Sequence, residues 1–399
     1  MGPYRKSLVK TVKALVFCIV GLVVVVVSVG LGFRAYRQYL NARALAIHSP
    51  NGIQEGMFVA IGGIDQWLQI RGEDRKNPVL LFVHGGPGAS TIPISSGWQP
   101  WEKYFTVVQW DQRGAGRTYR GTGRAIAPTM TVARMAQDGI EVAEYLRAHL
   151  HKDKIVLVGH SWGSFLGIHI VKQRPDLFYA YVGTGQVIGS ATFEKQFEVT
   201  IAHLQRLAQA VNNTEALMEL APIAARQNKL GDRLILEKWA KALALPSIES
   251  FKLAGRIPPP FMPDFSLLDW YYWRRGILFS AEYLRGRDGP MNQVDLRSLG
   301  VEFAIPMFFF EGTEDYMTPI QPAEQYFDQI EAPHKEFVRF ESGDHFIPLD
   351  RPDEFLAELL TRVRPLADPP NDHSVSDGGR RRATGQPDRS AVKRESARE

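Results

Sequence analysis

The chain has 399 residues, of which 45% are apolar and 23% charged, a composition that suits a globular protein with a sizeable core plus extensions. Its formal net charge of +4 is uneven, because residues 1–50 carry seven Lys and Arg and no Asp or Glu, which leaves −3 for residues 51–399. The basic excess therefore belongs to one end, and we expect no nucleic-acid partner. The single cysteine, Cys18, excludes disulfides and thiol-metal sites from the rest of the chain.

The first predicted element is a transmembrane helix. Ala14 to Phe33 is an uncharged, mostly apolar run, about as long as the 20 residues that a helix needs to cross a bilayer. Four basic residues precede this run and three follow it, which favours an amino terminus in the cytoplasm and the remaining chain outside it. A small-residue cleavage site is first found at Ala44-Leu45-Ala46, too far downstream for a signal peptide. We therefore expect a single-pass signal anchor in a lipid bilayer, rather than a cleaved signal or a buried helix.

Beyond residue 50, short apolar runs alternate with helical patterns. The strand-like runs are residues 58–61, 66–70, 79–83, 105–110, 155–158, 179–182, 305–310 and 337–340, and the first two flank a Gly62-Gly63 turn typical of a hairpin. The helical patterns are residues 132–149, 164–174, 321–330 and 352–364. This alternation predicts an α/β protein with a mostly parallel central sheet and helices on both faces.

Two regions depart from this alternation. Residues 190–295 have helical periodicity and aromatic clusters but no clear strand, which predicts a helical cap inserted between two strands. Residues 367–399 are rich in Pro, Gly, Ser and mixed charge, which predicts a disordered tail whose Arg380 to Arg382 cluster is solvated rather than lipid-bound. The expected domains are a membrane anchor (1–50), a core in two parts (51–189 and 296–366), the cap (190–295) and the tail (367–399).

The pentapeptide GHSWG at 159–163 is the most informative motif. Gly-x-Ser-x-Gly between a strand and a helix is typical of a nucleophile elbow, a sharp turn that exposes the serine hydroxyl. The glycines are needed because side chains at these positions would collide with the neighbouring strand and helix. The apolar run before Gly159 and the helical pattern after Gly163 supply the required context. We therefore predict Ser161 as a nucleophile, and the alternative is a glycine-rich turn with an idle serine.

A serine hydroxyl needs a base to take its proton and an acid to orient that base. On an elbow scaffold the acid follows a late strand and the histidine follows the final strand. Asp315 and His345 occupy these positions. The competing acids are Glu314 and Asp344, each a sequence neighbour of a chosen residue. The competing bases are His160, inside the elbow, and His84, which heads a glycine-rich loop.

That loop, HGGPG at 84–88, follows the strand-like run 79–83 and is predicted to stabilise an oxyanion. Its glycines let backbone N–H groups approach a developing negative charge without side-chain interference. The predicted donors are the N–H groups of Gly86 and Trp162. His84 and Gly85 are expected to order the loop, and the alternative is a simple tight turn.

Five motifs together resemble the prolyl iminopeptidase branch of the α/β-hydrolases. They are HGGPG at 84–88, WDQRGAG at 110–116, GHSWGS at 159–164, GTEDYMTP at 312–319 and GDHF at 343–346. The resemblance spans about residues 55–365 and implies an α/β-hydrolase fold with a triad of Ser161, Asp315 and His345. It also implies that the turn at 111–114, with Arg113, supports the oxyanion loop.

The cap departs from the family's pattern. Prolyl iminopeptidases bind the substrate's free amine through cap carboxylates, and the matching segment here reads VGTGQV at 182–187. Glu194 and Glu198 are the candidates for this role, although exposed helix carboxylates are the plainer interpretation. Trp270 and Trp273 are the aromatic candidates for contact with an apolar acyl group.

These features lead to the hypothesis of a membrane-anchored serine hydrolase that forms an acyl-enzyme. The expected substrate is a small acyl compound or short peptide, with release of an N-terminal residue as in prolyl iminopeptidases. The alternatives are a carboxylesterase or lipase-like hydrolase of small apolar esters and a non-catalytic binding protein on the same fold. No metal or organic cofactor is implied, and a carboxylate would replace Ser161 in an epoxide hydrolase or dehalogenase.

Overall fold

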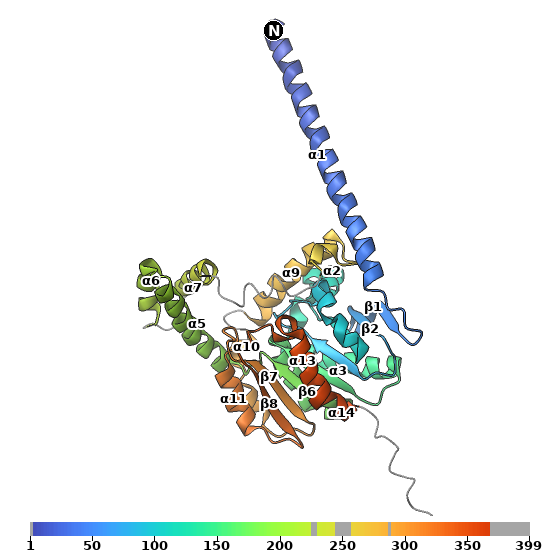
Figure 1. Cartoon of the computed structure of the whole chain (residues 1–399), viewed down its shortest axis with the longest axis vertical. Coiled ribbons are helices and arrows are strands. Elements are labelled where there is room, and N and C mark those ends of the chain that lie inside the picture. Colours follow the sequence, from blue (N-terminus) through green and yellow to red (C-terminus); the bar gives the residue numbers. More distant parts are fainter. Residues whose placement is uncertain (1–2, 225–229, 244–256, 286–288, 368–399) are drawn as a thin grey trace, which may run out of the picture. The chain divides into compact units, whose positions relative to one another are not determined.

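The computed structural model describes residues 3–224, 230–243, 257–285 and 289–367 (Figure 1). The predicted tail, apart from Ala367, lies outside the described residues. The first element, α1 (Pro3–Ala44), is a continuous helix that contains the predicted span. Among the described helices it alone is long and apolar enough to cross a membrane, and its length and hydropathy also suit a signal sequence. Its apolar side chains are exposed, as Val24 is at 58%.

Eight strands form one sheet in the order β1-β2-β4-β3-β5-β6-β7-β8. They are β1 (Ile53–Ile61), β2 (Ile64–Gly72), β3 (Val79–Val83), β4 (Thr106–Asp111), β5 (Ile155–His160), β6 (Phe178–Thr184), β7 (Met307–Gly312) and β8 (Lys335–Phe340). β2 runs antiparallel to β1 and β4, and all other neighbours are parallel. Gly62 and Gly63 both have positive φ, as a tight hairpin turn requires. The predicted mostly parallel sheet is confirmed.

Helices cover both faces of this sheet. They are α2 (Gly116–Thr122), α3 (Val132–Leu150), α4 (Trp162–Gln173), α11 (Ile320–Gln329), α12 (Ile347–Asp350), α13 (Pro352–Glu358), α14 (Arg364–Ala367), the 3-10 helices η1 (Ile92–Lys103), η2 (Gly123–Thr129), η3 (Pro175–Leu177) and η5 (Leu296–Leu299), and the π-helical turn η6 (Leu359–Val363). Side chains alternate across β3: Leu81 joins Ile140 of α3 in one core, and Phe82 joins Trp98 of η1 in the other. Two apolar cores therefore hold the strand ends in fixed positions.

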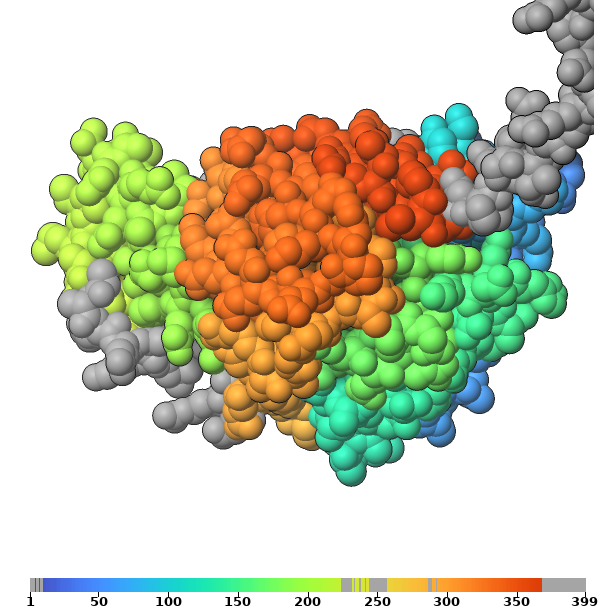
Figure 2. Space-filling view, turned by 90° about the horizontal axis from the view of Figure 1, so that it is seen from below, coloured from blue at the N-terminus to red at the C-terminus, as the bar shows by residue number. Residues whose placement is uncertain are grey.

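Between β6 and β7 the described chain contains helices and no strand. Besides η5, they are α5 (Ser190–Ala210), α6 (Thr214–Ala224), α7 (Leu230–Ala242), η4 (Pro259–Phe261), α9 (Leu267–Leu284) and α10 (Pro290–Gln293). α5 contacts the loop after β7, where the rings of His203 and Tyr316 lie 3.9 Å apart, and Figure 2 shows this yellow-green region beside the orange C-terminal part. α9 packs on α2, with Tyr119 and Phe279 stacked at 4.9 Å. The inserted region is helical in its described part, as expected.

Candidate active site

Ser161 lies on the turn between β5 and α4, as the motif predicts. Its backbone is at φ 54° and ψ −122°, a strained conformation for a residue with a side chain. A Cβ on Gly163 would lie 1.9 Å from the carbonyl oxygen of Val83, and one on Gly159 would lie 2.5 Å from the carbonyl oxygen of Gly163. Both positions therefore require glycine, because the neighbouring backbone atoms leave no space for a Cβ. Together they hold β3, β5 and α4 close enough to fix the serine.

Replacing Gly163 with alanine is expected to destabilise the fold. The new methyl group would overlap the Val83 carbonyl group, and relieving such an overlap by backbone shifts costs about 3 kcal/mol, the upper end of the usual cost of overpacking. Thermal unfolding of the purified variant measures the loss. Gly121→Ala is the matched control, because a Cβ there meets no atom within 4 Å. Equal unfolding temperatures for G163A and the native chain would contradict this close packing.

His345 and Asp315 form a buried pair on the loops after β8 and β7. His345 Nδ1 lies 2.8 Å from Asp315 Oδ2, and both side chains are almost fully buried. The other carboxylate oxygen, Oδ1, accepts the backbone N–H groups of Met317 and Thr318 at 2.8 and 2.7 Å. With Nδ1 bonded to a carboxylate, the ring carries its proton there and leaves Nε2 free to accept one.

The carboxyl group of Asp315 is held in its charged form. Burial acts to raise its pKa, but the imidazole of His345 and hydrogen bonds from His345 and Thr318 outweigh burial, so the pKa lies below its ordinary value. Thr318 Oγ1 donates to Asp315 Oδ2 at 2.6 Å and lies 3.0 Å from His345 Nδ1. Thr318 was not among the predicted site residues, and its only signal in the sequence is its place in the GTEDYMTP motif.

Ser161 and His345 line one cavity of about 210 Å³. Its walls are mostly apolar, with Phe82, Trp98, Val187, Phe193 and Ile277 among them. Within the described part of the chain, Arg285 is its one lining side chain with a permanent charge, and no carboxylate lines it. The cavity therefore suits an apolar group next to the serine.

The competing acids and bases are engaged elsewhere. Asp344 Oδ1 accepts the backbone N–H of Phe346 at 2.8 Å, and Glu314 is exposed. His160 Nε2 lies 2.8 Å from the carbonyl oxygen of His345, so that nitrogen carries the proton and donates it. His84 Nδ1 lies 2.9 Å from the carbonyl oxygen of Gly85. Among these residues only Asp315 contacts the His345 ring through a carboxylate oxygen.

The two buried histidines predict an acid-sensitive fold. Burial lowers the pKa of His84 to about 4, and burial together with electrostatic repulsion from the neighbouring imidazole of His345 lowers the pKa of His160 to about 3. The unfolded chain binds these protons near pH 6.5 and the folded chain does not, so stability falls as pH drops from about 6.5 towards 4.

Each histidine contributes up to about 1.4 kcal/mol per pH unit in that window. We expect His160→Gln to weaken the pH dependence of the unfolding temperature between pH 7 and pH 4.5, because glutamine keeps a donor for the His345 carbonyl group but does not titrate. An unchanged slope in this variant would show that His160 takes up its proton equally in both states.

The HGGPG loop lies directly against the serine. A Cβ on Gly85 would be 2.8 Å from Ser161 Cβ, and Gly86 has φ +116°, which favours glycine. Gly85 and Gly86 both line the cavity, and Trp162 begins α4 beside Ser161. The backbone N–H groups of Gly86 and Trp162 are therefore in the region where an oxyanion would form, and their role as donors stays a prediction.

Gln112, which lies in the 111–114 turn expected to support the loop but was not singled out there, ties this loop to the elbow. Its Nε2 donates to the carbonyl oxygen of His84 at 2.8 Å, and its Oε1 accepts the indole N–H of Trp162 at 3.0 Å. One amide side chain thus connects the oxyanion loop to the first turn of α4. The resemblance pointed to the turn that holds Gln112 and named Arg113 as the supporting residue, whereas the side chain of Gln112 makes the contacts.

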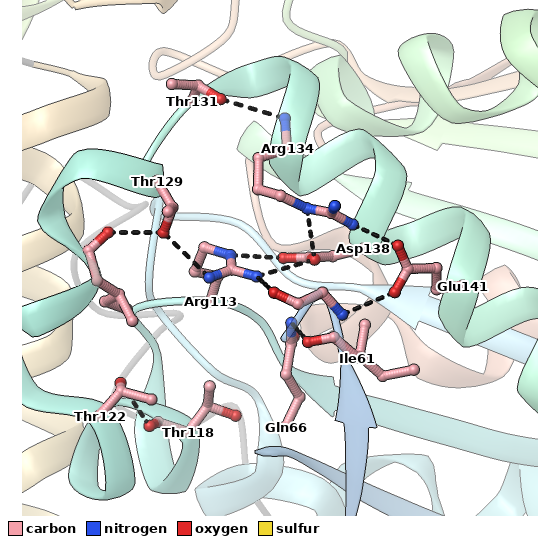
Figure 3. A network of polar contacts seen from close by, with 12 residues as sticks. Ile61, Gln66, Arg113, Thr118, Thr122, Thr129, Thr131, Arg134, Asp138 and Glu141 are labelled. Atoms are coloured by element: carbon pink, nitrogen blue, oxygen red, sulfur yellow. Dashed lines mark hydrogen bonds and ion pairs between the residues drawn. The ribbon is translucent and has the colours of Figure 1, made fainter. Parts of the chain in front are cut away.

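Arg113, expected to support the loop, points away from it. Its guanidinium group pairs with Asp138 of α3 at 2.7 Å and donates to the carbonyl oxygen of Gly62 and to Thr129 (Figure 3). Arg134 completes the network by binding both Asp138 and Glu141. Arg113 therefore joins the hairpin turn to α3, because a buried guanidinium group needs a carboxylate, and the loop offers none.

The predicted cap residues do not line the cavity. Glu194 and Glu198 line a separate surface depression with Lys195, to which Glu198 is paired at 2.8 Å. Trp270 and Trp273 stack on each other at 5.1 Å, and the Trp273 indole donates to the carbonyl oxygen of Ser90. The structure does not bring these four residues to the cavity that holds Ser161, and their assignment as substrate contacts stays a prediction. Helical spacing alone did not tell which face of each helix meets the cavity.

A mostly parallel sheet with a serine on the turn after β5 and a His–Asp pair after its last two strands is the arrangement of an α/β-hydrolase. The family model described as "Alpha/beta hydrolase family" matches residues 80–358, and the chain belongs to this family. The probable aminopeptidase YbaC of Bacillus subtilis is 30% identical over 310 residues, which cover 77% of this chain and 95% of YbaC.

Proteins named proline iminopeptidase are similar as well. That of Lactobacillus delbrueckii subsp. bulgaricus is 26% identical over 283 residues, which cover 67% of this chain and 85% of the relative. The crystal structure of proline iminopeptidase from Mycobacterium smegmatis has the same fold, with a TM-score of 0.54, 17% identity, and coverage of 76% of this chain and 96% of that one. The resemblance expected from the five motifs is confirmed.

Proposed function

We propose that this protein is a membrane-anchored serine hydrolase with a catalytic triad of Ser161, His345 and Asp315. The observation that carries the proposal is the buried His345–Asp315 pair. The His345 ring lines the same cavity as Ser161, and Ser161 lies on a strained turn. A serine becomes nucleophilic when a base beside it takes its proton and an acid orients that base. These three residues occupy the positions that such a mechanism needs.

In the proposed reaction, Ser161 Oγ bonds to the substrate acyl carbon while its proton passes to His345 Nε2. The carbonyl electron pair moves to the oxygen, which accepts the N–H groups of Gly86 and Trp162. Collapse of this intermediate breaks the bond to the leaving group, which takes the proton from Nε2. Water then repeats both steps, and a carboxylic acid and free Ser161 result. Asp315 stays ionised and stabilises the imidazolium at each stage.

For the substrate, we propose a short peptide that loses its N-terminal residue. The relatives named aminopeptidase and proline iminopeptidase support this choice, and the apolar cavity suits a proline ring. The cavity wall favours a second candidate, a small apolar ester. A peptidase that binds a free amine needs a carboxylate near the serine, and none lines the cavity in the described part of the chain.

Turnover by the full-length protein separates the two candidates. The substrates are prolyl-4-nitroanilide, its N-acetyl derivative and 4-nitrophenyl butyrate, which have a free amine, a blocked amine and no amine. An aminopeptidase hydrolyses the first and not the second. Hydrolysis of the butyrate alone would refute the peptidase and favour the esterase. Failure of Ser161 to react with a fluorophosphonate would refute the serine hydrolase itself.

The proposed anchor is α1, and the catalytic domain lies outside the cytoplasm. Support comes from the apolar run of α1 and the greater number of basic residues before it than after it. Protease added to intact cells should digest the domain. Protection of the domain while the membrane is unbroken would overturn this orientation.

A further inference from the structure

The last turns of α1 bind the segment that precedes cap helix α9. Gln38 Nε2 donates to the carbonyl oxygens of Met262 and Phe265 at 2.7 and 2.9 Å, and Asn41 Nδ2 donates to that of Phe261 at 2.9 Å. These two side chains share one face of α1. Figure 1 shows the start of α9, in gold, beside the end of α1. The cap is thus attached directly to α1.

This attachment begins at the residue where the apolar run of α1 ends. Phe33, the last residue of that run, has its ring 5.8 Å from the ring of Phe261. Arg34, the first charged residue after it, donates to the carbonyl oxygen of Phe265. A run of about 20 apolar residues matches the hydrocarbon thickness of a bilayer, so Phe33 would lie at its boundary. The segment 261–265 would then lie at the level of the lipid headgroups.

The first turns of α9 expose large apolar side chains at that level. Leu267, Leu268 and Tyr271 are 55%, 48% and 54% exposed, and they share one helix face. Arg274, one turn further, is exposed as well. Leucine and tyrosine followed by arginine is the combination found at membrane interfaces, where apolar side chains enter the acyl boundary and cations meet the headgroups. We name Leu267, Leu268 and Tyr271 the α9 tip.

We propose that the α9 tip is a membrane-binding surface that enters the headgroup layer of the glycerophospholipid bilayer crossed by α1. This inference rests on the membrane anchor of the proposed function. The same helix reaches the catalytic cavity, since Ile277 in its second half and Arg285, which caps its C-terminal end, line that cavity. Trp273, between the tip and Ile277, donates to Ser90 beside the oxyanion loop. The bilayer therefore holds one end of a helix whose other end forms a wall of the substrate site.

Site-directed spin labelling of the full-length protein tests the surface, because Cys18 is the only native cysteine. In a Cys18→Ala background, Leu268→Cys is labelled with a nitroxide and reconstituted in vesicles of phosphatidylcholine and phosphatidylglycerol. Collisions with oxygen, which partitions into lipid, and with a water-soluble nickel chelate are compared. We expect oxygen to exceed nickel at position 268 in vesicles, and the ratio to reverse at Leu366→Cys, an exposed leucine of α14.

A label on native Cys18 separates the two possible failures. If Cys18 is deep in the bilayer while position 268 collides with nickel as freely as position 366, the membrane-binding surface is refuted and the anchor stands. If Cys18 itself is open to nickel, the anchor fails and this inference fails with it. Tyr271→Cys gives a second reading of the α9 tip, and fluorophosphonate labelling of Ser161 in each variant verifies that it is folded.

Discussion

Replacing Ser161 with alanine is expected to abolish turnover of every substrate that the protein hydrolyses. Without Oγ no acyl-enzyme can form, and removal of the serine from a triad of this kind costs about a million-fold in kcat. Reaction with a fluorophosphonate, detected by the mass added to the protein, should also be lost. Stability should change little, because the hydroxyl group lies at the cavity wall and alanine keeps the Cβ that contacts Gly85.

The control for this prediction is Ser298→Ala, which removes an exposed hydroxyl group far along the chain from the elbow. It should react with the fluorophosphonate as the native protein does. Persistent modification of the S161A variant would move the nucleophile to another residue. Loss of modification in both variants would point to misfolding, which the unfolding temperature measures directly.

The parts of the site that could be predicted from the sequence are those fixed by backbone. Glycine is required at positions 159 and 163 because a Cβ there would lie within 2.5 Å of backbone atoms. Such a requirement can be seen in the sequence as a local motif. The same holds for Gly62 and Gly63, whose positive φ closes the first hairpin. Asp315 and His345 follow from chain order, because the strands that precede them were legible as apolar runs. Local constraints of this kind can be recognised from one sequence alone.

The parts that were missed depend on which way a side chain turns. Gln112 and Arg113 are adjacent in the turn after β4, yet their side chains reach different neighbours, the oxyanion loop and α3. Arg113 was expected from the resemblance to support the loop, yet its side chain pairs with Asp138, twenty-five positions further along the chain. Glu194 lines a separate surface depression, which helical periodicity could not show because it does not identify the neighbour of each helix face. Short helices such as α2, with glycines at Gly116 and Gly121, left no periodic signal at all.

Replacing Asp315 with asparagine is expected to lower kcat about ten-thousand-fold while the fold is retained. The amide keeps the shape of the side chain but can donate a hydrogen bond to His345 Nδ1, which places the ring proton on Nε2. In that tautomer the ring cannot accept the proton of Ser161. The variant also loses the negative charge that stabilises the imidazolium in the proposed reaction. Steady-state kinetics at pH 7 on the best substrate of the panel measures the loss.

Two neighbouring carboxylates provide matched controls for D315N. Glu314→Gln changes the adjacent residue, whose side chain is exposed, and Asp344→Asn changes the residue next to His345, whose Oδ1 binds the backbone of Phe346. Neither carboxylate contacts the imidazole in this arrangement, so we expect each variant to keep kcat within about tenfold of the native value. A loss of this size in D344N, with kcat retained in D315N, would assign the acid to Asp344. The His345 ring would then have to turn away from its present contact of 2.8 Å with Asp315.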